Sequence, residues 1–366
     1  MIGLSTGGFA LLLSFSTACT PEPVLYVSPQ GNDAWTGTLA EPSADGADGP
    51  LATVSRAQEC VREMKNCGEG LTGSVDVILR EGVYRQSSPL VFLSADSGTE
   101  LCPIRYQAYS GEKPVISGGI EIAGWQQEGV LWKTSIAAGQ EFNQLFVGGE
   151  RRIRARMPNQ GEFFRADIRP SGIAADNQSF YFRAGDLENW NNLSDVIIVA
   201  YHSWETSIHH ISSLDTTAYL VTFQETAPWL FGDRWEEQQR YYVENVFEGL
   251  DAPGEWYLNR TTGTLYYYPM PGEERSTTVA VAPLITGPVV EFAGDPAMDA
   301  FVEHLHFEGI SFQHSNADLQ NITNPMQAEI YQSGLIQARG LQNSSFTDCE
   351  ITLAGAHGIW LGAGCL

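Results

Sequence analysis

A segment rich in histidine, tryptophan and glutamate offers the side-chain types that cleavage of a glycosidic bond requires. It runs His202-Ser203-Trp204-Glu205 and continues to His209 and His210. The flat face of Trp204 can stack on the C–H surface of a sugar, and a carboxylic acid shielded by aromatic rings has a raised pKa suited to proton donation. We therefore expect Glu205 to be catalytic and Trp204 and His210 to contact a substrate. An aromatic core with hydrogen-bonded histidines is the alternative that stays open.

Two further carboxylates, Asp348 and Glu350, alternate along a segment that reads as a strand. On a regular strand they share one face, about 7 Å apart at the backbone. Glycoside hydrolysis uses two carboxyl groups about 5–5.5 Å apart for retention and roughly 6.5–9.5 Å apart for inversion, so the pair is a permitted catalytic pair. We expect His314 and His357, at the ends of neighbouring strands, to bind substrate in the same groove. A solvated, outward-facing pair is the alternative.

Three arginines, Arg152, Arg154 and Arg156, also alternate and predict one basic face of a strand. Guanidinium groups so placed can hold a sugar carboxylate in bidentate fashion, with Arg154 at the centre of the strip. The interpretation that we favour is structural, since 44 acidic residues are available to pair with them.

Metal-binding and redox motifs are weak in this sequence. The loops at Gly31-Asn32-Asp33 and at residues 44–49 could hold Ca²⁺, but they lack EF-hand spacing. No Cys-x-x-Cys pair, phosphate loop or His-Glu-x-x-His occurs among the 366 residues. The six cysteines allow disulfides in an oxidising compartment, such as one between Cys67 and Cys102, or buried free thiols. We therefore expect no metal or cofactor.

The chain as a whole is acidic. Its 366 residues carry 20 Lys and Arg against 44 Asp and Glu, a formal net charge of −24. This charge argues against binding to nucleic acid or to an anionic membrane surface, because both need a basic footprint. It also favours hydrolysis of a neutral glycan over cleavage of a polyuronate. Hydrophobic residues, at 43%, suffice for a substantial core.

The first 24 residues read as a signal peptide. Residues 9–15 form an apolar run shorter than the ~20 residues that span a bilayer, and small residues precede Cys19. The pattern predicts export and is similar to a bacterial lipoprotein signal, in which Cys19 becomes lipidated. The expected location is periplasmic, outer-membrane-anchored or extracellular. An ordinary cleaved signal peptide is the alternative.

The elements that must position these residues are mostly short strands, which run through the chain between Gly, Pro and Ser residues. One helix is expected at 53–65. Residues 25–119 are expected to hold this cap helix and the first strands, 120–290 an inserted antiparallel β module, and 291–366 repeated strand triplets. Such triplets are typical of a parallel β-helix, so the expected class is all-β. The last coil ends at Leu366 without a cap, as expected of a truncated solenoid.

Several motifs carry a family resemblance. They are Tyr26-Val27-Ser28-Pro29-x-Gly31-Asn32-Asp33, Gly49-Pro50-Leu51-Ala52-Thr53, Arg151-Arg152-x-Arg154-Ala155-Arg156-x-Pro158-Asn159, Tyr242-Val243-Glu244-Asn245, Pro253-Gly254-Glu255-Trp256-Tyr257-Leu258 and Gly355-Ala356-His357-Gly358-Ile359-Trp360-Leu361. Together they resemble extracellular right-handed parallel β-helix proteins of the pectate-lyase-like type, and most closely those of glycoside hydrolase family 141.

The resemblance implies fucosidase- or xylanase-type activity on plant cell-wall glycans, in a monomer whose partner is a polysaccharide or oligosaccharide. It also implies that most catalytic carboxylates lie in later coils, beyond Leu366. A non-catalytic carbohydrate-binding β-helix protein and a polysaccharide lyase are the alternatives.

Overall fold

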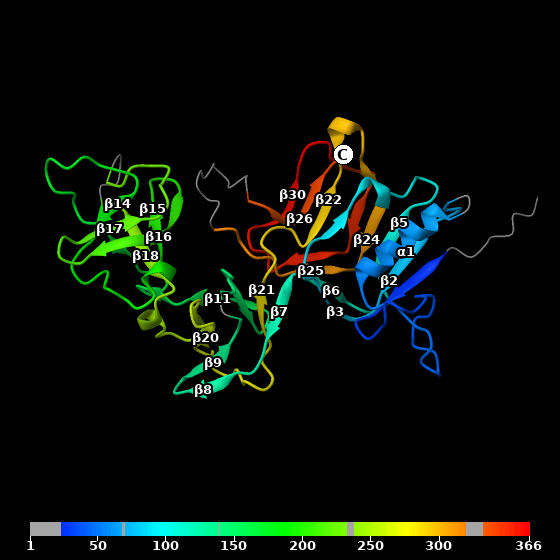
Figure 1. The fold of residues 1–366 in the computed structure, drawn as a ribbon, viewed down its shortest axis with the longest axis horizontal. Helices are drawn as coiled ribbons and strands as arrows, with labels where there is room; N and C mark the ends of the chain where they lie inside the picture. Colours follow the sequence, from blue (N-terminus) through cyan, green and yellow to red (C-terminus); the bar gives the residue numbers. More distant parts are fainter. Residues whose placement is uncertain (1–22, 68–69, 138, 233–237, 320–331) are drawn as a thin grey trace, which may run out of the picture.

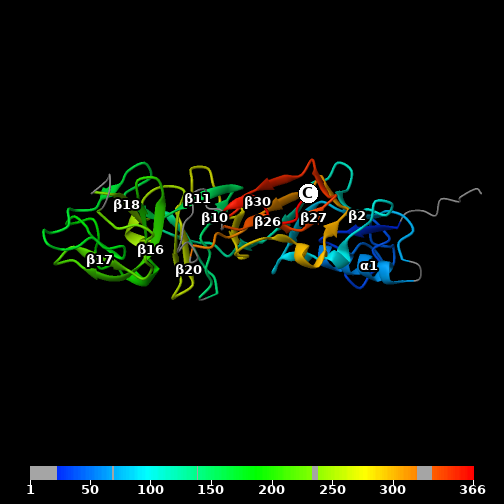
Figure 2. The same ribbon diagram turned by 90° about the horizontal axis from the view of Figure 1, so that it is seen from above.

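The computed structural model describes residues 23–366 except 68–69, 138, 233–237 and 320–331. Parallel sheets and the helix α1 (Val54–Asn66) lie at one end of an elongated molecule, and antiparallel sheets lie at the other (Figures 1 and 2). Residues 1–22, which include Cys19 and nearly all of the expected signal peptide, lie outside the described part. Within that part, no helix is long and apolar enough to cross a membrane.

The described chain returns several times to the same three parallel sheets and passes through them in the same order each time. The first contains β1 (Val24–Val27), β2 (Val75–Leu79), β5 (Ile104–Ala108), β24 (Leu305–Glu308) and β28 (Ser345–Thr347). The second contains β3 (Gly82–Arg85), β6 (Pro114–Ser117), β25 (Ser311–Gln313) and β29 (Glu350–Thr352). The third contains β4 (Leu90–Phe92), β22 (Val290–Ala293), β26 (Gly334–Arg339) and β30 (His357–Leu361), and a short pair joins β23 (Val302–Glu303) to β27 (Leu341–Gln342).

Aromatic side chains from successive turns of the chain stack inside these sheets. The rings of Phe92 and Phe292 lie 5.2 Å apart, those of Tyr106 and Phe307 5.2 Å, and those of Phe307 and Phe346 5.0 Å. Parallel strands in register place like residues above one another, so each turn repeats the core of the one before.

Helix α1 lies where the sequence predicts it. The Thr53 hydroxyl accepts a hydrogen bond from Arg56 N at 3.1 Å, and the Asp33 carboxylate accepts bonds from Ala52 N and Thr53 N. These contacts satisfy backbone donors that have no partner within the helix. Val54, Ala57 and Val61 are buried against the parallel sheets.

Replacing Thr53 by alanine is expected to lower the free energy of unfolding by about 1 kcal/mol, because the side-chain cap of α1 is lost. Urea unfolding followed by tryptophan fluorescence measures the change. Ser55→Ala, an exposed position two residues later in the same helix, is the control and is expected to change stability by less than about 0.5 kcal/mol. Equal effects of the two substitutions would contradict the capping role.

The segment between β6 and β22 forms two further sheets. One has the order β7 (Gly119–Ile122), β21 (Ala280–Pro283), β10 (Leu145–Val147), β11 (Glu150–Arg154), β19 (Glu255–Asn259), β20 (Thr264–Tyr267), β9 (Leu131–Ser135) and β8 (Gln126–Glu128). The other has the order β12 (Arg156–Met157), β18 (Arg240–Glu244), β15 (Ile197–Tyr201), β16 (Thr206–Asp215), β17 (Leu220–Phe223) and β14 (Ser179–Tyr181), and β13 (Phe164–Arg165) also pairs with β18. All pairs in these two sheets are antiparallel except β11 with β19.

The all-β class expected from the sequence is therefore confirmed, with sheets of both kinds. Short 3₁₀ helices lie at Ser94–Asp96, Leu193–Asp195, Phe247–Gly249 and Pro296–Met298. The cysteines of the described residues, which include Cys67 and Cys102, form no disulfide with one another, and Cys60 is a buried thiol.

Candidate functional site

One face of the sheet that contains β15, β16 and β18 carries polar and aromatic side chains. Ile197 pairs with Glu244 on one side and with His210 on the other, and Glu244 pairs with Arg156. Directly opposed residues share a face of a sheet, so these four side chains form one row. The neighbouring positions Val196, Ile198 and Val243 point to the other face and fill a hydrophobic core. We call the surface that carries Arg156, Tyr201, His210, Tyr242 and Glu244 the polar face.

Glu244 is the acid of the polar face, and its carboxylate makes few polar contacts. Its Oε2 lies 3.7 Å from Arg154 Nη1, and its side chain is 21% exposed. Among the described residues, no hydrogen bond to this carboxylate is found, and Arg154 Nη1 is a buried donor without a hydrogen-bond acceptor. Burial raises the pKa of Glu244 above its ordinary value, against the opposing charges of Arg154 and Arg156. A carboxyl group in such surroundings can hold a proton and release it to a substrate.

Arginine and aromatic side chains continue the polar face from Glu244 along β18. The guanidinium of Arg156 lies 3.6 Å from the centre of the Tyr242 ring and donates to the carbonyl oxygens of Pro158 and Glu162. Phe163 and Tyr201 pack edge to face with their ring centres 5.2 Å apart, and both rings are partly exposed. Flat rings of this kind offer an apolar surface on which the C–H face of a sugar can stack.

His210 forms a carboxylate–imidazole pair at the end of the same row. Its Nδ1 lies 2.8 Å from Glu225 Oε1, and its backbone N–H donates to Glu225 Oε2 at 2.8 Å. The carboxylate accepts a hydrogen bond from Nδ1 and so fixes the orientation of the ring, with Nε2 as its other polar atom. Such a pair can orient a hydroxyl group or a water molecule.

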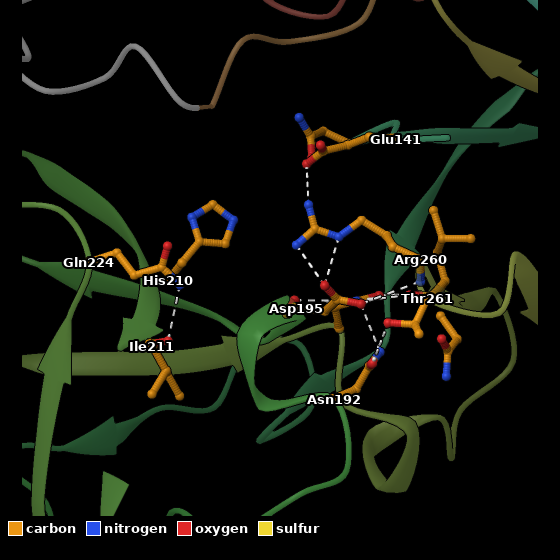
Figure 3. A network of polar contacts seen from close by, with 12 residues as sticks. Glu141, Asn192, Asp195, His210, Ile211, Gln224, Arg260 and Thr261 are labelled. Carbon is orange, nitrogen blue, oxygen red and sulfur yellow. Dashed lines mark hydrogen bonds and ion pairs between the residues drawn. The ribbon is translucent and has the colours of Figure 1, made fainter. Parts of the chain in front are cut away.

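A chain of ion pairs holds the polar face against the neighbouring sheet. The Arg260 guanidinium donates to Glu141 Oε1 at 2.5 Å and to Asp195 Oδ1 at 2.9 Å, and Asn192 Nδ2 donates to Asp195 Oδ2 at 2.8 Å. Figure 3 shows Arg260 between these two acids, with the imidazole of His210 pointing into the same region. These contacts fix the position of β15, which begins two residues after Asp195.

Replacing Asp195 by asparagine is expected to lower the free energy of unfolding by about 2 kcal/mol, because hydrogen bonds from the charged Arg260 are weakened. Thermal unfolding measures this loss. Asp299→Asn, an exposed residue of the parallel part, is the matched control. A variant as stable as the parent protein would show that Asp195 does not stabilise this junction.

The structure places Glu205 directly before β16, with its backbone carbonyl accepting from His202 N at 2.8 Å. Trp204 is 49% exposed and packs edge to face with Trp229 at 5.2 Å. His202 and His209 point into the core, where both bond Ser207 Oγ. The segment thus contains both expected kinds of environment, a core of hydrogen-bonded histidines and a surface with an exposed tryptophan.

The expected geometry of Asp348 and Glu350 is wrong. Asp348 follows β28 with a left-handed backbone (φ 50°), and Glu350 begins β29 in another sheet. The two residues therefore lie on either side of a turn and do not share the face of one strand. Both side chains are exposed, and Ser311 Oγ lies 3.4 Å from Glu350 Oε2.

The remaining expected residues are spread over the molecule. His314 is buried where β25 ends, with Nδ1 2.9 Å from Ser117 Oγ, and burial lowers its pKa to about 4. His357 begins β30 in the third parallel sheet. Arg152 bonds Glu273 at 2.8 Å and Arg154 Nη1 lies 3.7 Å from Glu244, so these two arginines have acidic partners, whereas Arg156 donates to backbone carbonyls. The expected single basic strand face is wrong, because Arg152 and Arg154 lie on β11 and Arg156 lies on β12 of the other sheet. Of the expected substrate-binding residues, Arg154 and His210 lie at the polar face.

Glu244 and Glu225 were not singled out from the sequence. The alternation Tyr241-Tyr242-Val243-Glu244 indicates a strand with Glu244 on one side, but pairing with β12 and β15 is needed to place Arg156 and His210 in its row. Among the described residues, no group of three or more His, Cys, Asp and Glu side chains is arranged to hold a metal ion.

Comparisons with known proteins agree with this architecture. Residues 129–270 match the family model of the GH141 insertion domain. A solved structure described as a glycoside hydrolase aligns with a TM-score of 0.74 at 23% identity, over 92% of this chain and 63% of that chain. The structure of XylC with xylose aligns with a TM-score of 0.41 at 15% identity, over 88% of this chain and 40% of that chain. No curated protein matches. The insertion-domain model supports the resemblance to GH141-like proteins, and the first structure shows that the fold is shared. The chain spans 63% of the length of that structure.

Proposed function

We propose, from the GH141 insertion domain that residues 129–270 match, that this protein takes part in the hydrolysis of a plant or microbial polysaccharide. The observation that carries the proposal is the carboxyl group of Glu244, whose side chain is 21% exposed and lies next to the partly exposed Tyr242 on the same face of β18.

The polar face supplies two parts of such a reaction. A sugar ring stacks on Phe163 and Tyr201, and the protonated Glu244 donates its proton to the glycosidic oxygen as the bond to the leaving group breaks. Arg154 then stabilises the carboxylate that forms, because its Nη1 is already 3.7 Å from Glu244 Oε2. His210, held by Glu225, accepts a hydrogen bond from a sugar hydroxyl. A second carboxylate completes the mechanism. Asp348 and Glu350 lie in the parallel sheets and not on the polar face, so Glu205 is the remaining candidate of the three.

We propose further that the three parallel sheets form coils of a right-handed parallel β-helix. The order β2–β3–β4, then β24–β25–β26 and β28–β29–β30, supports this, since each set passes through the same three sheets in turn. Export through residues 1–24, with lipidation at Cys19 and a monomeric state, belongs to the same proposal. Metabolic labelling with a radioactive fatty acid, compared between the parent protein and Cys19→Ala, tests the lipid anchor: label in the variant would exclude Cys19 as the acceptor.

The test of hydrolysis is incubation of the full chain with neutral xylans, fucosylated glycans and polygalacturonate. New reducing ends without ultraviolet absorbance are the expected result. A product that absorbs through a new C=C bond would identify a lyase instead. Saturable binding of a glycan without product would identify a carbohydrate-binding protein. The absence of both binding and product would overturn the proposal.

A further inference from the structure

A cavity of about 190 Å³ lies apart from the polar face, between the second parallel sheet and the strands β7, β10 and β21 of the inserted segment. Figure 1 shows β7 and β21 beside β6 and β25 in this region. Side chains from both parts of the protein line the cavity. We infer that this cavity binds one small aromatic carboxylic acid or its ester, with the ring between the apolar walls and the carbonyl group at His314 and Gln313.

The walls of the cavity fit an aromatic ring. Val115 of β6, Val281 of β21, Phe146 of β10 and Leu353 line it. An enclosed apolar cavity of about 150 Å³ suffices to bind benzene, so a volume of about 190 Å³ accommodates a six-membered ring with a short substituent. A sugar ring fits these walls less well, because its hydroxyl groups would face valine and leucine and lose their hydrogen bonds to water.

Hydrogen-bond donors lie at one end of the cavity. Gly119 N donates to Ser117 Oγ at 3.1 Å, and Ser117 Oγ lies 2.9 Å from His314 Nδ1. In the inferred complex the Ser117 hydroxyl donates to Nδ1, and the neutral imidazole carries its proton on Nε2 and donates it to the ligand. Burial lowers the pKa of His314 to about 4, so the ring is neutral at pH 7. Arg85 and Gln313 also line the cavity, and Gln313 Nε2 donates one of its two protons to Ser311 Oγ at 2.9 Å.

The charges around the cavity allow both the acid and its ester. Arg85 is paired with Glu121 at 3.0 Å, and both side chains are about half exposed. The net charge at this rim is therefore near zero, so the rim does not select for a charged ligand. The group that binds is the carbonyl oxygen, which acid and ester both carry. A free phenolic acid and an acyl group attached to a glycan are the two sources of such a ligand. The inference does not depend on hydrolysis at the polar face.

Binding of p-coumarate and of methyl p-coumarate to the full chain, measured by calorimetry and by saturation-transfer NMR, tests the inference. We expect saturable binding with a dissociation constant in the millimolar range or tighter. Val115→Phe, which fills the cavity, is expected to weaken binding at least about tenfold. His314→Asn, which keeps a residue tolerant of the left-handed backbone at φ 63°, is expected to weaken binding about fivefold through loss of one hydrogen bond.

Val91→Phe is the matched control, since Val91 lies on β4 of another parallel sheet and is partly exposed. It should bind p-coumarate like the parent protein, and circular dichroism should show that all three variants are folded. Absence of saturable binding, equal binding by Val115→Phe and the parent protein, or equal competition by xylose would each overturn the inference. A feruloylated oligosaccharide that binds more tightly than methyl p-coumarate would identify the glycan-bound source, and weaker binding the free one.

Discussion

Replacing Glu244 by glutamine is expected to lower kcat/KM on a hydrolysed glycan by about 10²–10⁴-fold, the contribution of a general acid. Glutamine has the same shape but cannot donate a proton to the glycosidic oxygen. Binding of the same glycan should change little, because the rings of Phe163 and Tyr201 and the guanidinium of Arg156 are retained. Initial rates and calorimetric binding, both measured on the purified full chain, separate the two effects.

The pH dependence of this reaction carries a second signature of Glu244. Burial raises the pKa of its carboxyl group, so the proton donor stays protonated at a higher pH than an ordinary glutamate, whose pKa is about 4.3. The alkaline limb of the rate profile should therefore lie above that value and disappear in Glu244→Gln. Protonation of Glu244 also stabilises the folded state. This stabilisation is present at low pH and is lost as the pH rises through the raised pKa of Glu244.

Glu205→Gln is the comparison that the sequence itself suggests. If the residue before β16 is the proton donor, this variant loses turnover sharply and Glu244→Gln does not. A rate unchanged in Glu244→Gln would remove Glu244 from the reaction, whichever result Glu205 gives. Glu248→Gln, an exposed position four residues after Glu244, controls for removal of charge from the insertion and should leave kcat/KM within about twofold.

The fold was more predictable than the site because the strands follow from local patterns. Short apolar runs between turns predict the strands, and the spacing of Val54, Ala57 and Val61 predicts helix α1. The turn at Asp348 has a counterpart earlier in the chain. Gly309 lies between β24 and β25 as Asp348 lies between β28 and β29, and both residues have a left-handed backbone. A left-handed residue at the same position in successive strand sets indicates a turn, which excludes a shared strand face for Asp348 and Glu350.

The polar face was not predictable in the same way because its pairings join distant segments. Arg156 meets Glu244 across 88 residues of sequence, since β12 pairs with β18. A single sequence does not give the register of two antiparallel strands, and a shift of one residue would move Glu244 to the core face. The motif that contains Tyr242 and Glu244 carried a resemblance, but only the pairings with β12 and β15 show which side chains surround the carboxylate.

Two histidines in the core of the insertion should make that part of the protein unfold in acid. His202 and His209 both place Nε2 within 2.8 Å of Ser207 Oγ, and Gln239 Nε2 donates to His202 Nδ1 at 3.3 Å. His202 therefore donates through Nε2 to Ser207, whose hydroxyl donates to His209 Nε2. A proton added to either ring breaks one of these bonds and buries a charge.

Burial lowers the pKa of both histidines to about 4, from an ordinary value of about 6.5. The unfolded chain binds these protons more tightly than the folded one, so stability is full above about pH 6.5 and is lost as the pH falls toward 4. A difference of this size corresponds to about 3 kcal/mol for each histidine. Urea unfolding followed by tryptophan fluorescence at a series of pH values should show this loss.

His209→Phe should remove about half of this pH dependence, because phenylalanine keeps the stacking on Phe223 at 4.6 Å but takes up no proton. His304→Asn is the control, as His304 lies at a partly exposed turn with φ 55°, which asparagine tolerates. Its slope of stability against pH should equal that of the parent protein. If His209→Phe retains the parent slope between pH 6.5 and 4, the protons are taken up elsewhere and the hydrogen-bond chain through Ser207 does not limit acid stability.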